Sequence, residues 1–182
     1  TDPERRFAFV VTGAGVQVYT IDPSTGKLNY IPAGLTPPGT VAPATSLTGS
    51  PTFPVMHPSG GHLYVSNQQA PGNIYGFDVD NSGNLTAMVG PPASPFPAGA
   101  SPLSIVMDPK GRFLYAVDAT AGASGVYSLP INSDGTLGID PAPIMLVSPV
   151  PGATVSTRIT YLTLHPNGKF AYATDNGGDL IY

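Results

Sequence analysis

The chain has 182 residues, ten aspartates, a single glutamate and no cysteine, and its formal net charge is −4. Its seven lysines and arginines are scattered and form no basic stripe that could neutralise phosphates, so no nucleic-acid partner is expected. No apolar run is long enough for a membrane span, and the absence of cysteine excludes disulfides and thiolate metal sites.

Composition and pattern together predict an all-β protein. Aspartate, together with 22 glycines and 22 prolines, favours turns, whereas the helix formers glutamate and lysine are scarce. No window of the chain shows a sustained helical period. The glycines and prolines recur at fixed offsets between apolar runs, which indicates an ordered repeat rather than a disordered chain.

One phrase occurs four times, beginning at Asp2, His57, Asp108 and His165. In each copy Pro follows the first residue, Gly stands fourth in three of the copies, and an apolar run completes the phrase. Pro and Gly at these places are typical of a tight turn between two strands. The copies are 55, 51 and 57 residues apart, and periods near fifty that hold several short strands are typical of a β-propeller.

Taken in chain order, the predicted strands divide one propeller domain into four blades. Residues 1–49 hold the second to fourth strands of a blade, 50–100 and 101–157 each hold a four-stranded blade, and 158–182 hold the first three strands of the last. The predicted strands, leaving out the fourth of each blade, are 7–11, 15–21, 50–56, 62–66, 73–79, 101–107, 113–117, 125–131, 158–164, 170–174 and 179 onward. A Gly-centred turn after each of the first three third strands predicts a fourth, outer strand.

An aromatic residue stands at the eighth position of every copy of the phrase, namely Phe9, Tyr64, Tyr115 and Tyr172. We expect these rings to wedge between neighbouring blades. About three and a half blades do not close a ring, because propellers generally carry four to eight. The preferred interpretation is that the chain is part of a longer ring and pairs with the missing half. Pairing of two copies, or closure as a four-bladed ring in which Tyr182 meets Thr1, are the alternatives.

The phrase His-Pro-x-Gly-x-x-x-Tyr, followed by a strand such as 74–79 and a Gly-Leu turn, resembles the seven-bladed lactonase family over essentially the whole chain. The best-known members of that family are the propeller-type 6-phosphogluconolactonases, with relatives among bacterial surface and exported proteins. The resemblance implies a ring of seven four-stranded antiparallel blades, of which this chain would supply about half.

The residues that the family resemblance would associate with activity do not stand at the matching positions. Family members often carry Arg and His five and four residues before the His-Pro pair; those places here hold Thr52-Phe53, Leu103-Ser104 and Thr160-Tyr161. The family also tends to show Asn-Glu after the second strand, where this chain has Asn67-Gln68, Asp118-Ala119 and Asp175-Asn176. If the Arg, His and Glu of an enzyme site exist, they lie in blades outside this sequence, so no catalytic residue is assigned.

Four residues are candidates for ligand binding. Arg158 is the only basic residue on a predicted first strand, and a guanidinium there suits an anionic ligand such as a sugar phosphate; an ion pair or a solvent-facing rim position is the structural alternative. Asn67, Asp118 and Asp175 share the eleventh repeat position, with Thr12 in the first copy, and could bind a cation or a sugar. Short polar residues at such places more often cap turns.

No metal site or cofactor is expected. The segment 78–83 has part of the pattern of a calcium loop, but Val89 stands where the acidic twelfth residue would be needed. His57 and His165 occupy the turn position that Asp2 and Asp108 hold in the other copies, which indicates turn capping rather than metal ligation or base catalysis.

Three long connections, about 31–49, 90–101 and 141–157, are rich in Pro, Ala, Gly, Ser and Thr. We expect them to emerge on one face and to form a broad, weakly charged surface. The first functional hypothesis is therefore a non-catalytic bacterial propeller scaffold, extracellular, periplasmic or at the cell surface, that binds a protein or polysaccharide. The alternatives are a lactonase whose catalytic residues lie mostly in other blades, and a sensor that binds a small ligand or metal in the channel.

Overall fold

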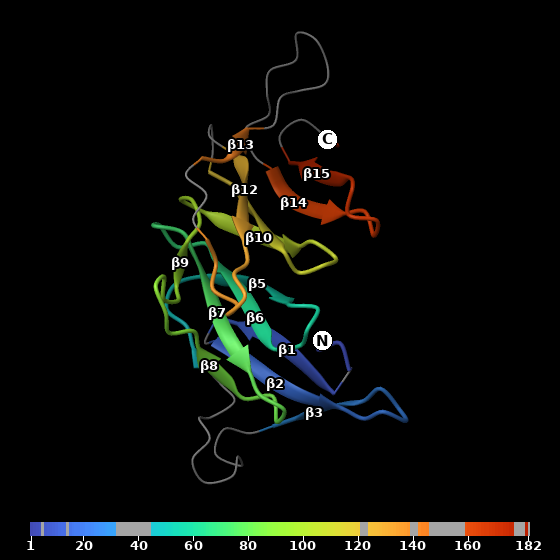
Figure 1. Cartoon of the computed structure of the whole chain (residues 1–182). Helices are drawn as coiled ribbons and strands as arrows, with labels where there is room; N and C mark the ends of the chain where they lie inside the picture. Colours follow the sequence, from blue (N-terminus) through green and yellow to red (C-terminus); the bar gives the residue numbers. More distant parts are fainter. Residues whose placement is uncertain are drawn as a thin grey trace.

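The computed structural model describes residues 1–4, 6–13, 15–31, 45–120, 124–138, 142–145, 159–176 and 181. The regular elements of this described part are β-strands, which form four antiparallel sheets. Figure 1 shows the sheets side by side in chain order, from the N-terminal sheet in blue to the C-terminal sheet in red. The chain is an all-β partial propeller, as the repeat predicts. No helix that could span a membrane is present among the described residues.

Each sheet is one blade of the propeller. Blade one contains β1 (Phe7–Thr12), β2 (Gly15–Ile21), β3 (Leu28–Tyr30) and β4 (Thr45–Ser46). Blade two contains β5 (Pro51–Met56), β6 (His62–Asn67), β7 (Asn73–Val79), β8 (Leu85–Ala87) and β9 (Phe96–Pro97). Blade three contains β10 (Pro102–Met107), β11 (Phe113–Asp118), β12 (Gly125–Pro130) and β13 (Ile144–Met145). Blade four contains β14 (Ile159–Leu164) and β15 (Ala171–Asp175).

A tight turn joins the first strand of a blade to the second, as the repeated phrase predicts. The carbonyl of His57 accepts a hydrogen bond from the N–H of Gly60 at 2.9 Å, and the copies that begin at Asp108 and His165 repeat this bond. The glycines at the fourth turn position, Gly60, Gly111 and Gly168, have φ values of 78°, 70° and 69°. These values lie in the left-handed region that glycine adopts without strain, so the sequence encodes the turn directly.

The blades pack flank to flank through three apolar clusters, one at each blade interface. Phe9 lies in the cluster between blades one and two, Tyr64 in that between blades two and three, and Tyr115 packs against that between blades three and four. Tyr64 is fully buried, and burial of such a side chain contributes roughly 1.5–3 kcal/mol. The predicted aromatic wedges are therefore confirmed at these three interfaces. Tyr172 of blade four is 43% exposed.

The outer strand of each blade differs from the prediction. In blade two it is split into β8 and β9, which both pair with β7, and in blade one β3 and β4 both pair with β2. Part of each predicted connection thus belongs to the sheet. Phe96, within the predicted connection 90–101, is 1% exposed in the core between blades two and three. The prediction of an exposed surface is wrong for this residue, because an apolar ring gains more from the blade interface than from solvent.

The first strands lie along the inner edge of the array, where β5, β10 and β14 contact one another in order and β1 contacts β5. The sheets radiate outward from this edge, which is the geometry of a propeller around an axis. Side chains on β5, β10 and β14 are therefore the ones that can face a central channel. The blue and red sheets lie at opposite ends of the array in Figure 1.

Candidate functional site

Each first strand carries an irregularity in its pairing with the second strand, at the same place in the repeat. The register shifts between Pro51 and Pro54 in β5, between Pro102 and Ser104 in β10, and between Ile159 and Tyr161 in β14. Bulges bend a strand and redirect its side chains, and they are frequent next to functional sites. The residues at these irregularities, Thr52, Phe53, Leu103, Ser104, Thr160 and Tyr161, are therefore the first place to seek a channel site.

At the first of these bulges, hydroxyl groups tie blade two to blade three. The hydroxyl of Thr52 donates to the carbonyl of Leu103 at 2.8 Å and lies 2.8 Å from the hydroxyl of Ser66. The Ser66 hydroxyl in turn accepts a hydrogen bond from the N–H of Phe53 at 3.0 Å. This network holds the backbone of the bulge in place and fixes the direction in which Phe53 leaves the strand.

Two aromatic side chains from non-adjacent blades meet at these bulges. The ring centroids of Phe53 on β5 and Tyr161 on β14 are 6.1 Å apart, and the ring planes are tilted by 54°. Phe53 is 38% exposed and Tyr161 46% exposed. The two rings thus contact each other and are also partly exposed. They lie on strands of the inner edge.

Ser104 occupies the same repeat position on β10, the strand between β5 and β14. It is 1% exposed, and its hydroxyl has no hydrogen-bond partner in the described structure. A buried hydroxyl without a partner costs free energy, so such groups are rare in folded proteins. The site therefore offers two exposed rings and one buried, unsatisfied hydroxyl.

The predicted rim residues lie at the ends of the second strands and contact the backbone. The side-chain oxygen of Asn67, Oδ1, accepts a hydrogen bond from the N–H of Ser50 at 2.7 Å. The carboxylate of Asp118 accepts from the N–H groups of Ala100 at 2.8 Å and Ser101 at 3.2 Å. Both side chains are nearly inaccessible, and each holds the entry to the first strand of its own blade.

The close approach of these side chains requires glycine on the connection. A Cβ atom added at Gly49 or Gly99 would collide with the side-chain oxygens of Asn67 or Asp118, respectively. The contacts favour the turn-capping interpretation, and ligand binding by Asn67, Asp118 and Asp175 stays a prediction. Asp175 is 6% exposed at the end of β15.

The remaining predicted residues are placed as follows. Thr12 ends β1, and its hydroxyl donates to the carbonyl of Gly15 at 3.1 Å. Arg158 lies outside the described residues, so its role also stays a prediction. The described residues hold no group of three or more His, Asp or Glu side chains suited to a metal ion. Asp80, in the segment that has part of a calcium-loop pattern, accepts hydrogen bonds from the N–H groups of Ser82 and Asn84.

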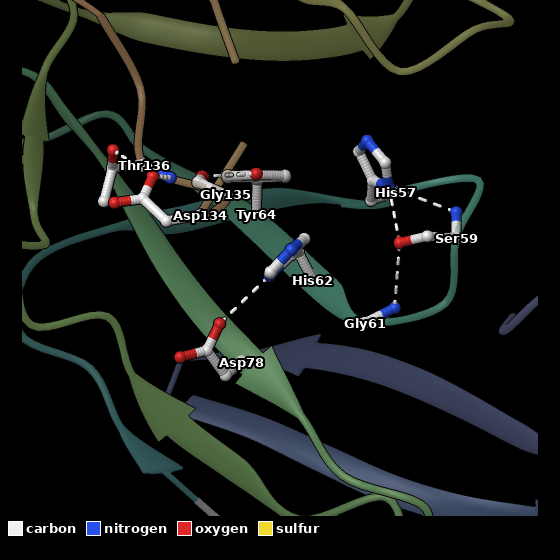
Figure 2. A network of polar contacts seen from close by, with 9 residues as sticks. All are labelled: His57, Ser59, Gly61, His62, Tyr64, Asp78, Asp134, Gly135 and Thr136. Carbon is white, nitrogen blue, oxygen red and sulfur yellow. Dashed lines mark hydrogen bonds and ion pairs between the residues drawn. The ribbon is translucent and has the colours of Figure 1, made fainter. Parts of the chain in front are cut away.

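Polar contacts of His57 and Tyr64 join blades two and three; Figure 2 shows His57 with Ser59 and Tyr64 with Gly135. His57 Nε2 donates to the carbonyl of Gly111 at 3.0 Å, and His57 Nδ1 accepts from the N–H of Ser59 at 3.1 Å. These contacts confirm turn capping and place the imidazole proton on Nε2. The reach of His57 into blade three was not predicted, because the sequence does not show which turn lies beside it.

Tyr64 forms a second bond between the same two blades. Its hydroxyl donates to the carbonyl of Gly135 at 2.6 Å. Burial, with the nearby carboxylates of Asp78 and Asp134, raises the pKa of Tyr64 far above its usual value near 10. The hydroxyl therefore keeps its proton and acts as a structural donor. His62 lies beside it and pairs with Asp78 at 3.0 Å.

The described inner strands offer groups that can contact a ligand, but few that can transfer a proton. Residues 51–56, 102–107 and 159–164 contain no Asp, Glu, His, Lys or Arg. General acid–base catalysis needs a titratable group within hydrogen-bonding reach of the reacting atoms. The part of the channel formed by these strands therefore supplies hydroxyls, backbone groups and aromatic rings.

Radiating four-stranded antiparallel blades around an inner edge define a β-propeller. A family model described as lactonase, 7-bladed β-propeller, matches residues 11–182. The chain belongs to this lactonase family, as the repeated phrase suggested. No protein with curated annotation matches it significantly in sequence.

Solved structures of several propellers resemble the chain. A protein of Lactobacillus plantarum has a TM-score of 0.71 at 15% identity, over 98% of this chain and 50% of that one. A provisionally assigned 6-phosphogluconolactonase of Bacteroides fragilis has a TM-score of 0.65 at 18% identity, over 96% and 48%. A periplasmic gluconolactonase of Pseudomonas aeruginosa has a TM-score of 0.60 at 23% identity, over 97% and 49%. The chain spans about half the length of these proteins, and the likeness establishes the fold.

Proposed function

We propose that these blades belong to a hydrolase that opens the ring of a sugar lactone, with gluconolactone as the model substrate. The match of residues 11–182 to the lactonase family is the observation that carries this proposal. The neighbours named as a 6-phosphogluconolactonase and a gluconolactonase support the same substrate class.

Lactone hydrolysis places specific demands on such a site. Water attacks the carbonyl carbon, a negatively charged tetrahedral oxygen develops, and the ring C–O bond breaks as a proton reaches the departing oxygen. A guanidinium aimed at the developing charge stabilises this transition state. In this chain Arg158 is the residue that we propose for that role, while the acid and base would come from other blades.

The test is an assay of glucono-δ-lactone and 6-phosphogluconolactone hydrolysis by the purified protein in its natural length, followed by proton release. We expect turnover well above the spontaneous rate, and an Arg158→Ala variant should lose roughly 10²–10³-fold in kcat, the usual effect of removing one oxyanion donor. Lys169→Ala is the matched control, since it removes a cation from a turn outside the inner strands. Hydrolysis no faster than the spontaneous rate would refute the proposal.

The non-catalytic scaffold is the second candidate, and the lack of Asp, Glu, His, Lys and Arg side chains on the described inner strands favours it. In that case the protein would bind a protein or polysaccharide without turnover, so binding in the absence of hydrolysis distinguishes the two candidates. Under either candidate we propose export to the periplasm or cell surface, which the periplasmic neighbour supports. Immunodetection in periplasmic and cytoplasmic fractions tests this location.

A further inference from the structure

The two exposed rings at the inner edge form a surface that packing alone does not explain. Phe53 and Tyr161 belong to blades two and four, and their ring centroids are 6.1 Å apart. More than a third of each side chain is nevertheless exposed. Aromatic residues that only fill a core are usually covered on both faces, as Tyr64 is between its two blades.

The strand between the two rings carries a small residue, Ser104, at the matching position. β10 lies between β5 and β14, and Ser104 holds the repeat position that Phe53 and Tyr161 hold on the flanking strands. The rings of Phe53 and Tyr161 therefore meet across β10, where the equivalent residue is small.

The Ser104 hydroxyl is the second, independent observation. Ser104 is paired with Val117, which packs with Ile159 in the cluster between blades three and four. The hydroxyl therefore lies on the side of β10 that faces β14, the strand of Tyr161. It is buried and has no partner in the described structure, so a ligand oxygen that reaches it would satisfy a group that otherwise costs free energy.

We propose that Phe53, Tyr161 and Ser104 form a binding platform for the ring of a neutral sugar, a pyranose or its δ-lactone. Aromatic faces carry partial negative charge and attract the polarised C–H groups on one face of such a ring. The Ser104 hydroxyl would hydrogen-bond a ring substituent at the edge of the platform. The inference rests on the proposed function, because it identifies the part of the lactone that these blades recognise.

The lack of charged side chains on these strands affects whether a phosphorylated or an unphosphorylated ligand binds better. The described strands β5, β10 and β14 contain no lysine, arginine or histidine. A phosphate group placed against them would lose its hydration without gaining an ionic partner, which is unfavourable. In an Arg158→Ala background, which removes the cation next to β14 in the sequence, the platform should therefore select the unphosphorylated ring over the 6-phosphorylated one.

The experiment uses D-glucono-1,5-lactam, a ring analogue of the lactone that does not hydrolyse, and its 6-phosphate. Saturation-transfer NMR on the natural-length protein identifies which ligand protons lie against the protein, its loss in the Phe53→Ala and Tyr161→Ala variants assigns the contact to the rings, and a titration gives Kd. We expect Phe53→Ala and Tyr161→Ala each to raise Kd roughly fivefold to tenfold, the range for loss of one aromatic contact. Tyr161→Phe should keep the affinity because it keeps the ring.

Two further variants separate binding from folding. Tyr30→Ala removes a ring that is 47% exposed on the outer strand β3 and should leave Kd unchanged. Ser104→Ala removes the unsatisfied hydroxyl; it should weaken lactam binding about fivefold while leaving the free energy of unfolding unchanged or higher. A merely structural role for Ser104 would not produce this opposite pair of effects.

The outcomes distinguish this inference from the proposed function. Equal lactam affinity in wild type and the Phe53→Ala/Tyr161→Ala double variant overturns the platform, even if lactone is hydrolysed. Absence of lactam binding by the wild-type protein also overturns it, as does tighter binding of the 6-phosphate than of the lactam by the Arg158→Ala variant. Ring-dependent lactam binding without any lactone hydrolysis supports the platform and refutes the hydrolase.

Discussion

The hydrogen bond from Tyr64 to Gly135 gives a sharp test of how the blades are held together. Tyr64→Phe keeps the ring in the interface between blades two and three and removes the hydroxyl alone. The carbonyl of Gly135, a buried residue, would lose its 2.6 Å donor. An unsatisfied buried acceptor costs about 1–3 kcal/mol, so we expect the free energy of unfolding to fall by about that amount.

Urea denaturation followed by circular dichroism measures this change. Tyr115→Phe is the matched control, because Tyr115 holds the same repeat position and its hydroxyl has no hydrogen-bond partner in the described part of the chain. We expect that substitution to change stability by less than about 0.5 kcal/mol, as for sites without a specific interaction. Equal effects of the two substitutions would refute the claim that the bond to Gly135 matters.

The pH dependence of the stability difference between wild type and Tyr64→Phe supplies an independent check. Burial raises the pKa of Tyr64 in the folded protein, whereas an unfolded tyrosine ionises near pH 10. Above that pH the unfolded state releases the proton while the folded state retains it, so this contribution to stability falls as pH rises. Tyr64→Phe lacks the contribution, and the stability gap between wild type and variant should therefore narrow above about pH 10. A gap that is constant or widens would contradict the assignment of Tyr64 as a buried donor.

Three further substitutions test the turns and the rim. Gly111→Ala should lower the free energy of unfolding by about 1–3 kcal/mol, since φ is 70° and the new methyl group would collide with His57; in a His57→Ala background, urea denaturation should show a smaller loss. Burial opposes ionisation of Asp108, but hydrogen bonds from the side chain and backbone of Arg112 lower the pKa of its carboxyl. The free energy of unfolding should therefore fall as pH drops below about 4, where the unfolded carboxyl takes up its proton. Asp108→Asn should make this decrease at acid pH smaller. Asn67→Ala should cost about 1–2 kcal/mol if the side chain caps the connection, and a loss of lactam affinity without loss of stability would instead indicate a ligand-binding residue.

The sequence predicted those parts of the fold that depend on local chemistry. Pro and Gly in the anchor phrase specify a tight turn by themselves, and the structure has that turn at Gly60, Gly111 and Gly168. The shared eighth position of the repeated phrase also placed Phe9, Tyr64 and Tyr115 correctly at blade interfaces. These predictions succeed because each requires only a few neighbouring residues and a repeated context.

The outer edge could not be predicted in the same way. Phe96 looks like part of a loop, because prolines and small residues surround it. Its burial depends on β9 adding to β7 and on blade three lying against it, and neither contact is local. The available signal for this burial was an aromatic ring among the small and polar residues of the connection. A large aromatic side chain seldom remains in solvent when a blade interface is within reach.

The candidate channel site shows a further limit of prediction by residue type. A search for the family's His on the first strands finds Phe53, Ser104 and Tyr161 at the matching positions, and so reports an absence. The structure brings the rings of Phe53 and Tyr161 together, because equivalent repeat positions on β5, β10 and β14 become neighbours only when the blades share an axis. Apart from the proposed role of Arg158, chemistry that needs charged groups would have to come from other blades, whereas recognition of an uncharged ring needs only what these strands contain. Within this propeller, binding and proton transfer can therefore be divided between different sectors of one channel, and the sector that β5, β10 and β14 form is suited to binding.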